Sequence, residues 1–400
     1  NMSDKDRVLI SGAGPVGCSA ALYLAQRGIP VTLVEAAADL PEDLRASTFH
    51  PPTLDMLDEL GVVDKVIEQG IVCPVWQYRD TREGVVAEWD LSVLENDTGH
   101  PYRVQCEQYK LTRIIVAELQ QMDNVEVLFE AKGTGVSQDD ETVTLSAETL
   151  EGPRELCGKY LIAADGASSV IRISQGIEFP GLTFPELWLC TSSEFNFEDH
   201  FENLAPIAYI ADPNFWFVFV RVPGLWRLLL PSRPGETAES LVSDATVQER
   251  MQQVCPIEGD YDTFHRTAYA VHQRVAETYR RGRVFLAGDA AHINNPLGGM
   301  GMNGGIHDAL NLSEKLVKVW NGKAVDSELD KYDAQRRPIA IDYVQQTTIR
   351  NKAMLEETDP DARRRKHDEM SASAADPKLA RDYLLQSSMI TALKRAEALA

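Results

Sequence analysis

The 400-residue chain holds 39 lysine and arginine residues against 61 aspartate and glutamate residues, a formal net charge of −22 at pH 7. Nucleic acids and anionic membranes are bound through clustered basic side chains, so this charge argues against both kinds of partner. Hydrophobic residues make up 44% of the chain, as in a globular protein, and none of the apolar runs is long enough for a membrane span. Six scattered cysteines without a C-x-x-C pair predict reduced thiols, no metal site and a cytoplasmic protein.

The first predicted element is a strand, turn, helix and strand over residues 7–35, RVLISGAGPVGCSAALYLAQRGIPVTLVE. Its turn has the G-x-G-x-x-G spacing of a dinucleotide site. Gly12 permits the turn, Gly14 admits a pyrophosphate, and Gly17 lets the helix pack on the strand. Glu35 ends the second strand, where it can accept hydrogen bonds from a ribose diol. The alternative is a glycine-rich turn of another α/β fold. The residues expected to contact the cofactor here are Gly12, Gly14, Pro15, Val16, Gly17, Glu35 and Ala36.

The middle of the chain mixes both kinds of element. Residues 75–105 predict short strands, and the apolar spacing of residues 108–120 predicts a helix. Two strand-like runs, VEVLFEA at 125–131 and TVTLSAET at 142–149, are expected to pair with each other. Residues 159–172 predict a buried strand that runs into a turn at Asp165.

Residues 181–275 are rich in aromatic and β-branched side chains and predict an antiparallel sheet. In the run FWFVFVRV, three phenylalanines share one face of a strand, with Phe217 at the centre, and Trp216 and Val218 lie on the other face. One face should cover a substrate and the other a core. Strand alternation does not distinguish them, and we assign the phenylalanine face to the substrate.

The most unusual run is GDAAHINNPLGGMGMNGG at 288–305, which follows a predicted strand at 283–287 and precedes a helical pattern from Ile306 to Trp320. Its second G-x-G-x-x-G lacks the strand context of a dinucleotide fold. The glycines instead lie at a helix N-terminus, which carries about half a positive charge. A flat ring that gains negative charge on reduction, such as isoalloxazine, can lie there without meeting a Cβ. Asp289 would then reach the ribityl hydroxyls.

These residues resemble a known family, the single-component FAD-dependent aromatic hydroxylases, to which 4-hydroxybenzoate hydroxylase belongs. The resemblance extends to about residue 345 and rests on the fingerprint at 12–17 with Glu35, on YLIAADGASSVIR at 160–172, and on GDAAHINNPLGGMGMNGGIHDA at 288–309. The last run is most similar to the branch that acts on 3-(3-hydroxyphenyl)propionate and similar phenols.

The resemblance implies roles for further residues. Arg45 and Gln108 match an arginine and a glutamine near FAD, and the motif at Asp165 is associated with both FAD and NAD(P)H. Pro296 would lie beside the flavin edge at which oxygen is activated, or would simply form a turn. His50 would position or deprotonate a phenolic hydroxyl, or would make a structural hydrogen bond. The remaining cofactor contacts implied at the glycine run are Asp289, Gly299, Gly301, Met302 and Asn303.

The resemblance implies an FAD-dependent monooxygenase. NAD(P)H would reduce the flavin, dioxygen would add to give a hydroperoxyflavin, and a phenolic or related aromatic substrate would be hydroxylated. The substrate contacts implied are His50, Phe217 and Pro296. Two alternatives remain open: an FAD-dependent dehydrogenase or reductase with little oxygenase activity, and an FAD-binding protein without catalysis.

The expected fold is α/β, with a Rossmann-like FAD-binding domain, a second domain built on an antiparallel sheet, and C-terminal helices. The FAD-binding domain is expected from residues 1–74, 106–180 and 276–345, and the substrate domain from 75–105 and 181–275. Residues 346–400 are expected to be a helical segment that serves as a homodimer surface or as a lid.

Overall fold

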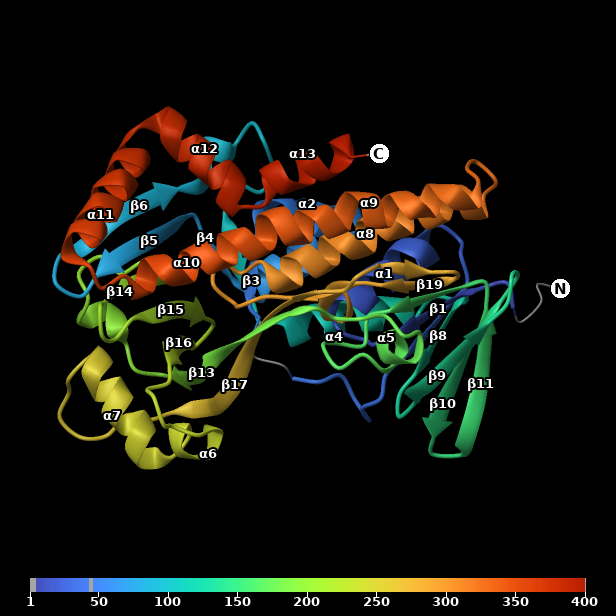
Figure 1. Ribbon diagram of the computed structural model, residues 1–400, viewed down its shortest axis with the longest axis horizontal. Coiled ribbons are helices and arrows are strands. Elements are labelled where there is room, and N and C mark those ends of the chain that lie inside the picture. The colour runs from blue at the N-terminus through green and yellow to red at the C-terminus, as the bar shows by residue number, and fades with distance from the viewer. Residues whose placement is uncertain (1–4, 43–45, 400) are drawn as a thin grey trace.

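The structure is a computed structural model that describes residues 5–42 and 46–399. Arg45, expected near the cofactor, lies outside the described residues. Two large sheets organise the chain, and a row of helices from its C-terminal half runs along both (Figure 1). None of the helices in the described ranges is long and apolar enough to cross a membrane.

The first sheet has six strands, of which five are parallel. Four of the five are buried at every residue, as expected of parallel strands with both faces covered. The order across the sheet is β18 (Arg280–Arg281), β19 (Val284–Leu286), β12 (Tyr160–Ala163), β1 (Val8–Ser11), β2 (Val31–Val34) and β8 (Val125–Leu128).

Helix α1 (Pro15–Gln26) follows β1 directly, as the fingerprint predicts, and ten of its twelve residues are buried. It is so deeply buried because α4 (Gln108–Leu119) and α8 (Gly301–Trp320) both pack on it. Beside these helices lie three short strands and two helices: β3 (Thr48–Phe49), β4 (Ile71–Cys73), β7 (Arg103–Gln105), α2 (Pro51–Glu59) and α3 (Val63–Glu68).

The pairing expected between residues 125–131 and 142–149 is wrong. Strand β8 joins the edge of the first sheet beside β2, whereas β10 (Val143–Thr149) pairs with β9 (Lys132–Gln138) and β11 (Gly152–Gly158). A tight turn decides the partner, because Asp139 accepts hydrogen bonds from the backbone of Glu141 and Thr142 and joins β9 to β10.

The second sheet has eight strands, and the antiparallel arrangement predicted for residues 181–275 is confirmed within it. Strand β14 also pairs in parallel with β5, which comes from much earlier in the chain. The order is β20 (His292–Ile293), β17 (Phe264–Val275), β13 (Gly181–Ser193), β16 (Leu225–Pro231), β15 (Phe217–Val222), β14 (Ile207–Ala211), β5 (Val75–Asp80) and β6 (Gly84–Asp90).

Helices complete the chain after α8. They are α9 (Asp330–Ile339), a π-helical segment η5 (Ala340–Gln345), α10 (Gln346–Glu356), α11 (Pro360–Ala375), α12 (Pro377–Ser387) and α13 (Ile390–Ala398). Helix α11 packs on β6 at the edge of the second sheet (Figure 1). Arg363 of α11 forms an ion pair there with Asp80 of β5, and their side chains are 10% and 3% exposed.

We predict that Arg363→Met lowers the free energy of unfolding by about 3 kcal/mol, because it leaves the Asp80 carboxylate buried without its partner. Urea unfolding measures the effect. Arg364→Met is the matched control, since Arg364 is 70% exposed and lies 4.0 Å from Glu83. The control should change stability by less than about 0.5 kcal/mol. Equal losses in the two variants would show that the buried pair does not hold α11 on the sheet.

Candidate functional site

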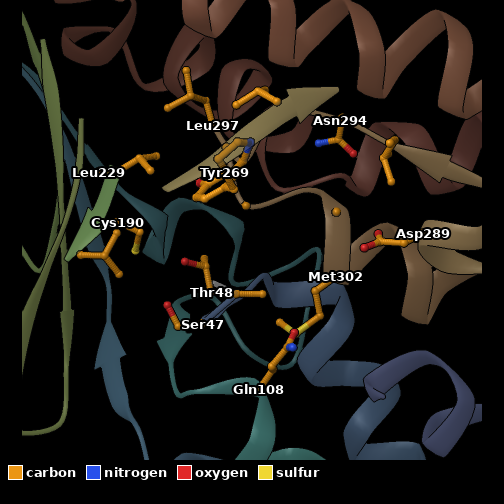
Figure 2. A pocket seen from close by; sticks show the side chains of 18 of the residues that line it. Ser47, Thr48, Gln108, Cys190, Leu229, Tyr269, Asp289, Asn294, Leu297 and Met302 are labelled. Carbon is orange, nitrogen blue, oxygen red and sulfur yellow. The ribbon is translucent and has the colours of Figure 1, made fainter. Parts of the chain in front are cut away.

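A cavity of about 440 Å³ lies between the two sheets. The turns after β1 and β12 and the loop from Ile293 to Met302 contribute to one part of its wall, and strands β13 to β17 contribute to the other. Figure 2 shows Cys190 and Leu229 from the second sheet at one end of this space and Asp289 at the other.

The three fingerprint glycines meet different surroundings. Gly12 has φ +105°, and a Cβ there would lie 2.1 Å from the carbonyl oxygen of Ala164. A Cβ on Gly17 would lie 1.8 Å from the carbonyl oxygen of Gly12. At Gly14, in contrast, no atom lies within 4 Å of an added Cβ, and this residue lines the cavity together with Pro15 and Val16. Only the middle glycine therefore exposes its backbone to a ligand.

The glycines in the run before α8 also differ in what surrounds them. Gly298 and Gly299 have φ +98° and +64°, a conformation that glycine adopts at little cost. A Cβ on Gly305 would lie 2.6 Å from Cγ2 of Val16, so this glycine lets α8 approach α1. Gly301 faces the cavity, where Asn294 Oδ1 is the nearest atom to an added Cβ, at 3.8 Å.

Helix α8 begins at Gly301 without a side-chain cap, so its first backbone N–H groups remain without partners from its own helix. Met302, also in the first turn, lines the cavity near Gln108, the first residue of α4 (Figure 2). The positive end of the α8 dipole therefore opens onto the cavity.

A buried ion network fixes the turn that carries Asp289. The carboxylate of Asp308 lies 2.7 Å from Nε of Arg336 and 2.5 Å from Nε2 of His292, and it accepts a hydrogen bond from the backbone N–H of Gly288. Burial raises the pKa of Asp308, but His292 and Arg336 outweigh burial and hold it below its ordinary value. Asp289, which follows Gly288, lines the cavity. Asp308 lies within the motif at 288–309, but no role was expected for it, and Arg336 belongs to none of the motifs.

His50 does not line the cavity, and its expected contact with a substrate stays a prediction. The residue is fully buried, and its Nε2–H donates to the carbonyl oxygen of Gly298 over 2.7 Å. Burial first, and then the charge of Arg103, holds the pKa of His50 well below its ordinary value. The other expected role, a structural hydrogen bond, is present: His50 holds the glycine loop at Gly298, on the side of the loop away from the cavity.

Phe217 also lies away from the cavity, so the face assigned to the substrate is wrong. Phe217 and Phe219 pack in the core between the second sheet and helices α6 (Ala238–Leu241) and α7 (Asp244–Val254). The opposite face of β15, with Val218 and Val220, lines the cavity. The larger side chains fill the layer between sheet and helices, and the smaller ones leave space for a ligand.

The other expected contacts divide into two groups. Residues that line the cavity are Gly14, Pro15, Val16, Gln108, Asp289, Pro296, Gly299, Gly301 and Met302. Residues that do not line it are Gly12, Gly17, Glu35, Ala36, Asp165 and Asn303.

The non-lining polar residues brace the loops around the cavity. Asp165 accepts a hydrogen bond from the hydroxyl of Ser169, and burial raises its pKa. The Asn303 side chain donates to the carbonyl oxygens of Thr48 and Gly299. Glu35 lies at the end of β2 beside the fingerprint turn, with Oε1 3.4 Å from the backbone nitrogen of Ala13.

Comparison with known proteins extends this picture. The family model described as FAD binding domain matches residues 5–347. The para-nitrophenol 4-monooxygenase of Pseudomonas sp. (strain WBC-3) is 34% identical over 393 residues, 96% of each chain. The 3-(3-hydroxy-phenyl)propionate/3-hydroxycinnamic acid hydroxylase of Escherichia coli O81 (strain ED1a) is 32% identical over 83% of this chain and 59% of its own.

Among solved structures, the crystal structure of p-nitrophenol 4-monooxygenase PnpA from Pseudomonas putida DLL-E4 superposes with a TM-score of 0.91 at 32% identity. That similarity covers 97% of this chain and 98% of the other, so it includes both sheets and the C-terminal helices. The chain therefore belongs to the FAD binding domain family, among the FAD-dependent aromatic hydroxylases that its motifs resemble.

Proposed function

We propose that this enzyme uses NAD(P)H and dioxygen to hydroxylate a small, one-ring phenol. The observation that carries the proposal is the composition of the cavity, where open glycine backbone and two helix N-termini meet an apolar sheet face. FAD, when bound, accepts electrons from NAD(P)H and transfers one atom of dioxygen to the aromatic ring.

The residues present fit FAD. The open backbone at Gly14, at the start of α1, suits a pyrophosphate, and Glu35 with Ala36 at the end of β2 suits the ribose. Asp289 would hold the ribityl chain, and the backbone from Gly299 to Asn303 would hold the flavin ring, with Gln108 beside it. Asp165 would brace the second turn, near which we place the transient contact with NAD(P)H.

The sheet end of the cavity fits a small aromatic ring. Val218, Leu229 and Val271 give it an apolar wall, and Pro296 with Leu297 lies opposite the sheet on the glycine loop. Because the whole cavity of about 440 Å³ must also hold the flavin ring, the remaining space suits one substituted ring. The similarity to the para-nitrophenol enzymes supports this size class.

The six-segment division into an FAD-binding domain, a substrate domain and a helical end remains part of the proposal. In this division, the FAD-binding domain contains the first sheet and the substrate domain contains the second. The cavity lies where the two sheets face each other, so both would contribute to catalysis.

The proposal predicts that bound FAD is reduced slowly by NAD(P)H until a substrate phenol is present. Within the described residues, only β1, α1 and β2 combine a G-x-G-x-x-G turn with a strand, helix and strand, and FAD would occupy that unit. NAD(P)H then binds transiently, and reaching the flavin ring requires the ring or a loop to move. Stopped-flow reduction with and without 4-nitrophenol or 4-hydroxybenzoate measures the gate.

Product analysis accompanies the same experiment. A hydroxylase consumes NAD(P)H and dioxygen in step with a hydroxylated product, whereas a reductase consumes NAD(P)H without one. Equal reduction rates with and without any phenol of the panel, and no hydroxylated product, would contradict the proposal and favour the reductase.

A second prediction concerns Gly301. Gly301→Val places a branched side chain in the cavity where the flavin ring would lie, so the variant should fold and lose at least about tenfold in FAD affinity. Absorbance of the purified protein and thermal unfolding of the apoprotein measure the two properties.

Gly304→Ala is the matched control on the next turn of α8. Its added Cβ would lie 3.6 Å from Cε of Met389 and 3.7 Å from Cε1 of His292, which are ordinary contacts. It should bind FAD normally. A Gly301→Val protein as yellow as the parent would show that the flavin ring does not lie against this backbone.

A further inference from the structure

Arg103, on β7, is a buried cation at the wall of the cavity. The residue is 3% exposed, and it lines the same space as Gly14 and Gly301. Across residues 5–42 and 46–399, its guanidinium forms neither a hydrogen bond nor an ion pair, and its Nε is buried without a partner. Its one recorded contact is with an aromatic ring, since Cζ lies 5.4 Å from the centroid of Trp76.

Among the buried arginines in residues 5–42 and 46–399, three have carboxylate partners, and Arg79 and Arg172 donate to carbonyl oxygens. Arg336 pairs with Asp308, Arg363 with Asp80, and Arg250 with Glu236. Arg227, which also lines the cavity, reaches Sγ of Cys190, at 3.8 Å. A buried guanidinium loses its hydration, and without a partner that loss is not offset. Arg103 therefore differs from the arginines that hold the fold together.

The titratable groups around Arg103 do not neutralise its charge. Burial lowers the pKa of the guanidinium itself, opposed by Tyr209 on β14, Tyr383 on α12 and Cys73 on β4. Burial raises the pKa of Cys73 to about 12 and also raises the pKa of each tyrosine, so all three are neutral near pH 7. His50 is neutral too, because burial and Arg103 depress its pKa.

We infer that Arg103 binds an oxyanion carried by the aromatic substrate, and so selects anionic rings over neutral rings of the same size. The inference rests on the proposed function and names the charge of its substrate. A guanidinium offers two parallel N–H donors that match a carboxylate and also bind a phenolate oxygen. Arg103 lies against Trp76 and Tyr209 of the second sheet, the part of the cavity where we place the substrate ring.

The test titrates the FAD-loaded protein with three probes and follows the flavin absorbance. They are 4-nitrophenol, which ionises to a phenolate, benzoate, which carries only a carboxylate, and 4-nitroanisole, which stays neutral. We expect the affinity of the parent for 4-nitrophenol to rise as pH passes upward through the pKa of that phenol, because the anion is the form that binds. We expect 4-nitroanisole to bind weakly, with no change with pH.

Arg103→Met should lower the affinity for the bound anion about 10- to 100-fold. It should also reverse the pH dependence for 4-nitrophenol, because the neutral form then binds better, and leave 4-nitroanisole unchanged. Arg103→Lys keeps the charge and should keep the sign of the pH dependence. Arg221→Met is the matched control: it removes a cation from the same region that is directed at Trp226 and Glu198 and does not line the cavity.

A purely structural role would give a different set of results. If Arg103 served only to pack on Trp76, Arg103→Met would lower the thermal midpoint and leave the pH dependence intact. Removing an unpaired buried charge should instead leave the midpoint unchanged or raise it.

Each outcome decides the inference. Parent-like anion affinity in Arg103→Met overturns it. So does parent protein that binds 4-nitroanisole as tightly as the phenolate, a result that needs no variant to fold. If benzoate binds in an Arg103-dependent way and no phenol binds, the oxyanion site is supported and the phenol is refuted as substrate. Parent protein that binds neither anion overturns the inference.

Discussion

The close contact between α1 and α8 at Val16 sets the geometry of the site. A Cβ on Gly288 would lie 2.8 Å from Cγ2 of Val16, and a Cβ on Gly305 would lie 2.6 Å from the same atom. Two segments that are far apart in the sequence therefore pack with only the Val16 side chain between their backbones. Because of this contact, the N-termini of both helices open onto one cavity, and their dipoles favour negative charge there together.

Charge is handled differently on the two sides of this contact. Behind α8, Asp308 is paired with Arg336 and His292 in the interior, and its network holds the turn of Asp289. On the cavity side of α8, the wall includes the positive ends of two helices and the unpaired guanidinium of Arg103. The protein thus satisfies its structural charges internally and leaves positive potential in the space that receives the reactants. A flavin that becomes anionic and an anionic substrate both match that potential.

The sequence predicted those parts of the site in which the backbone carries the function. Among the spaced glycines, Gly12, Gly17 and Gly305 mark a close approach, since an added Cβ would clash there. Gly14 and Gly301 instead leave open space at the cavity. The substrate side was harder to predict. Side chains alternate between the two faces of β15, and the pattern does not say which face is toward the substrate. The packing of α6 and α7 shows that Phe217 belongs to the core.

Contacts between residues that are distant in the sequence could not be predicted either. The family resemblance implies two roles for His50, but its hydrogen bond to Gly298 joins residues 248 positions apart. Nothing in the short strand RVQ indicates that Arg103 will be buried without a carboxylate. Such features depend on which distant segments meet, and a single sequence carries no local signal for that.

The parallel pairing of β14 with β5 has a consequence for how the chain folds. It joins Ala208 to Gln77, and the Arg363–Asp80 pair adds a contact that spans 283 positions. Strands β5 and β6 pair with each other, but β5 remains without β14 until about half of the chain has been synthesised, and Asp80 remains without Arg363 until most of it has. Contacts of such large sequence separation slow folding and expose strand edges to other chains in the meantime. We expect this protein to depend on chaperones more than its length suggests, and its two sheets to mature together.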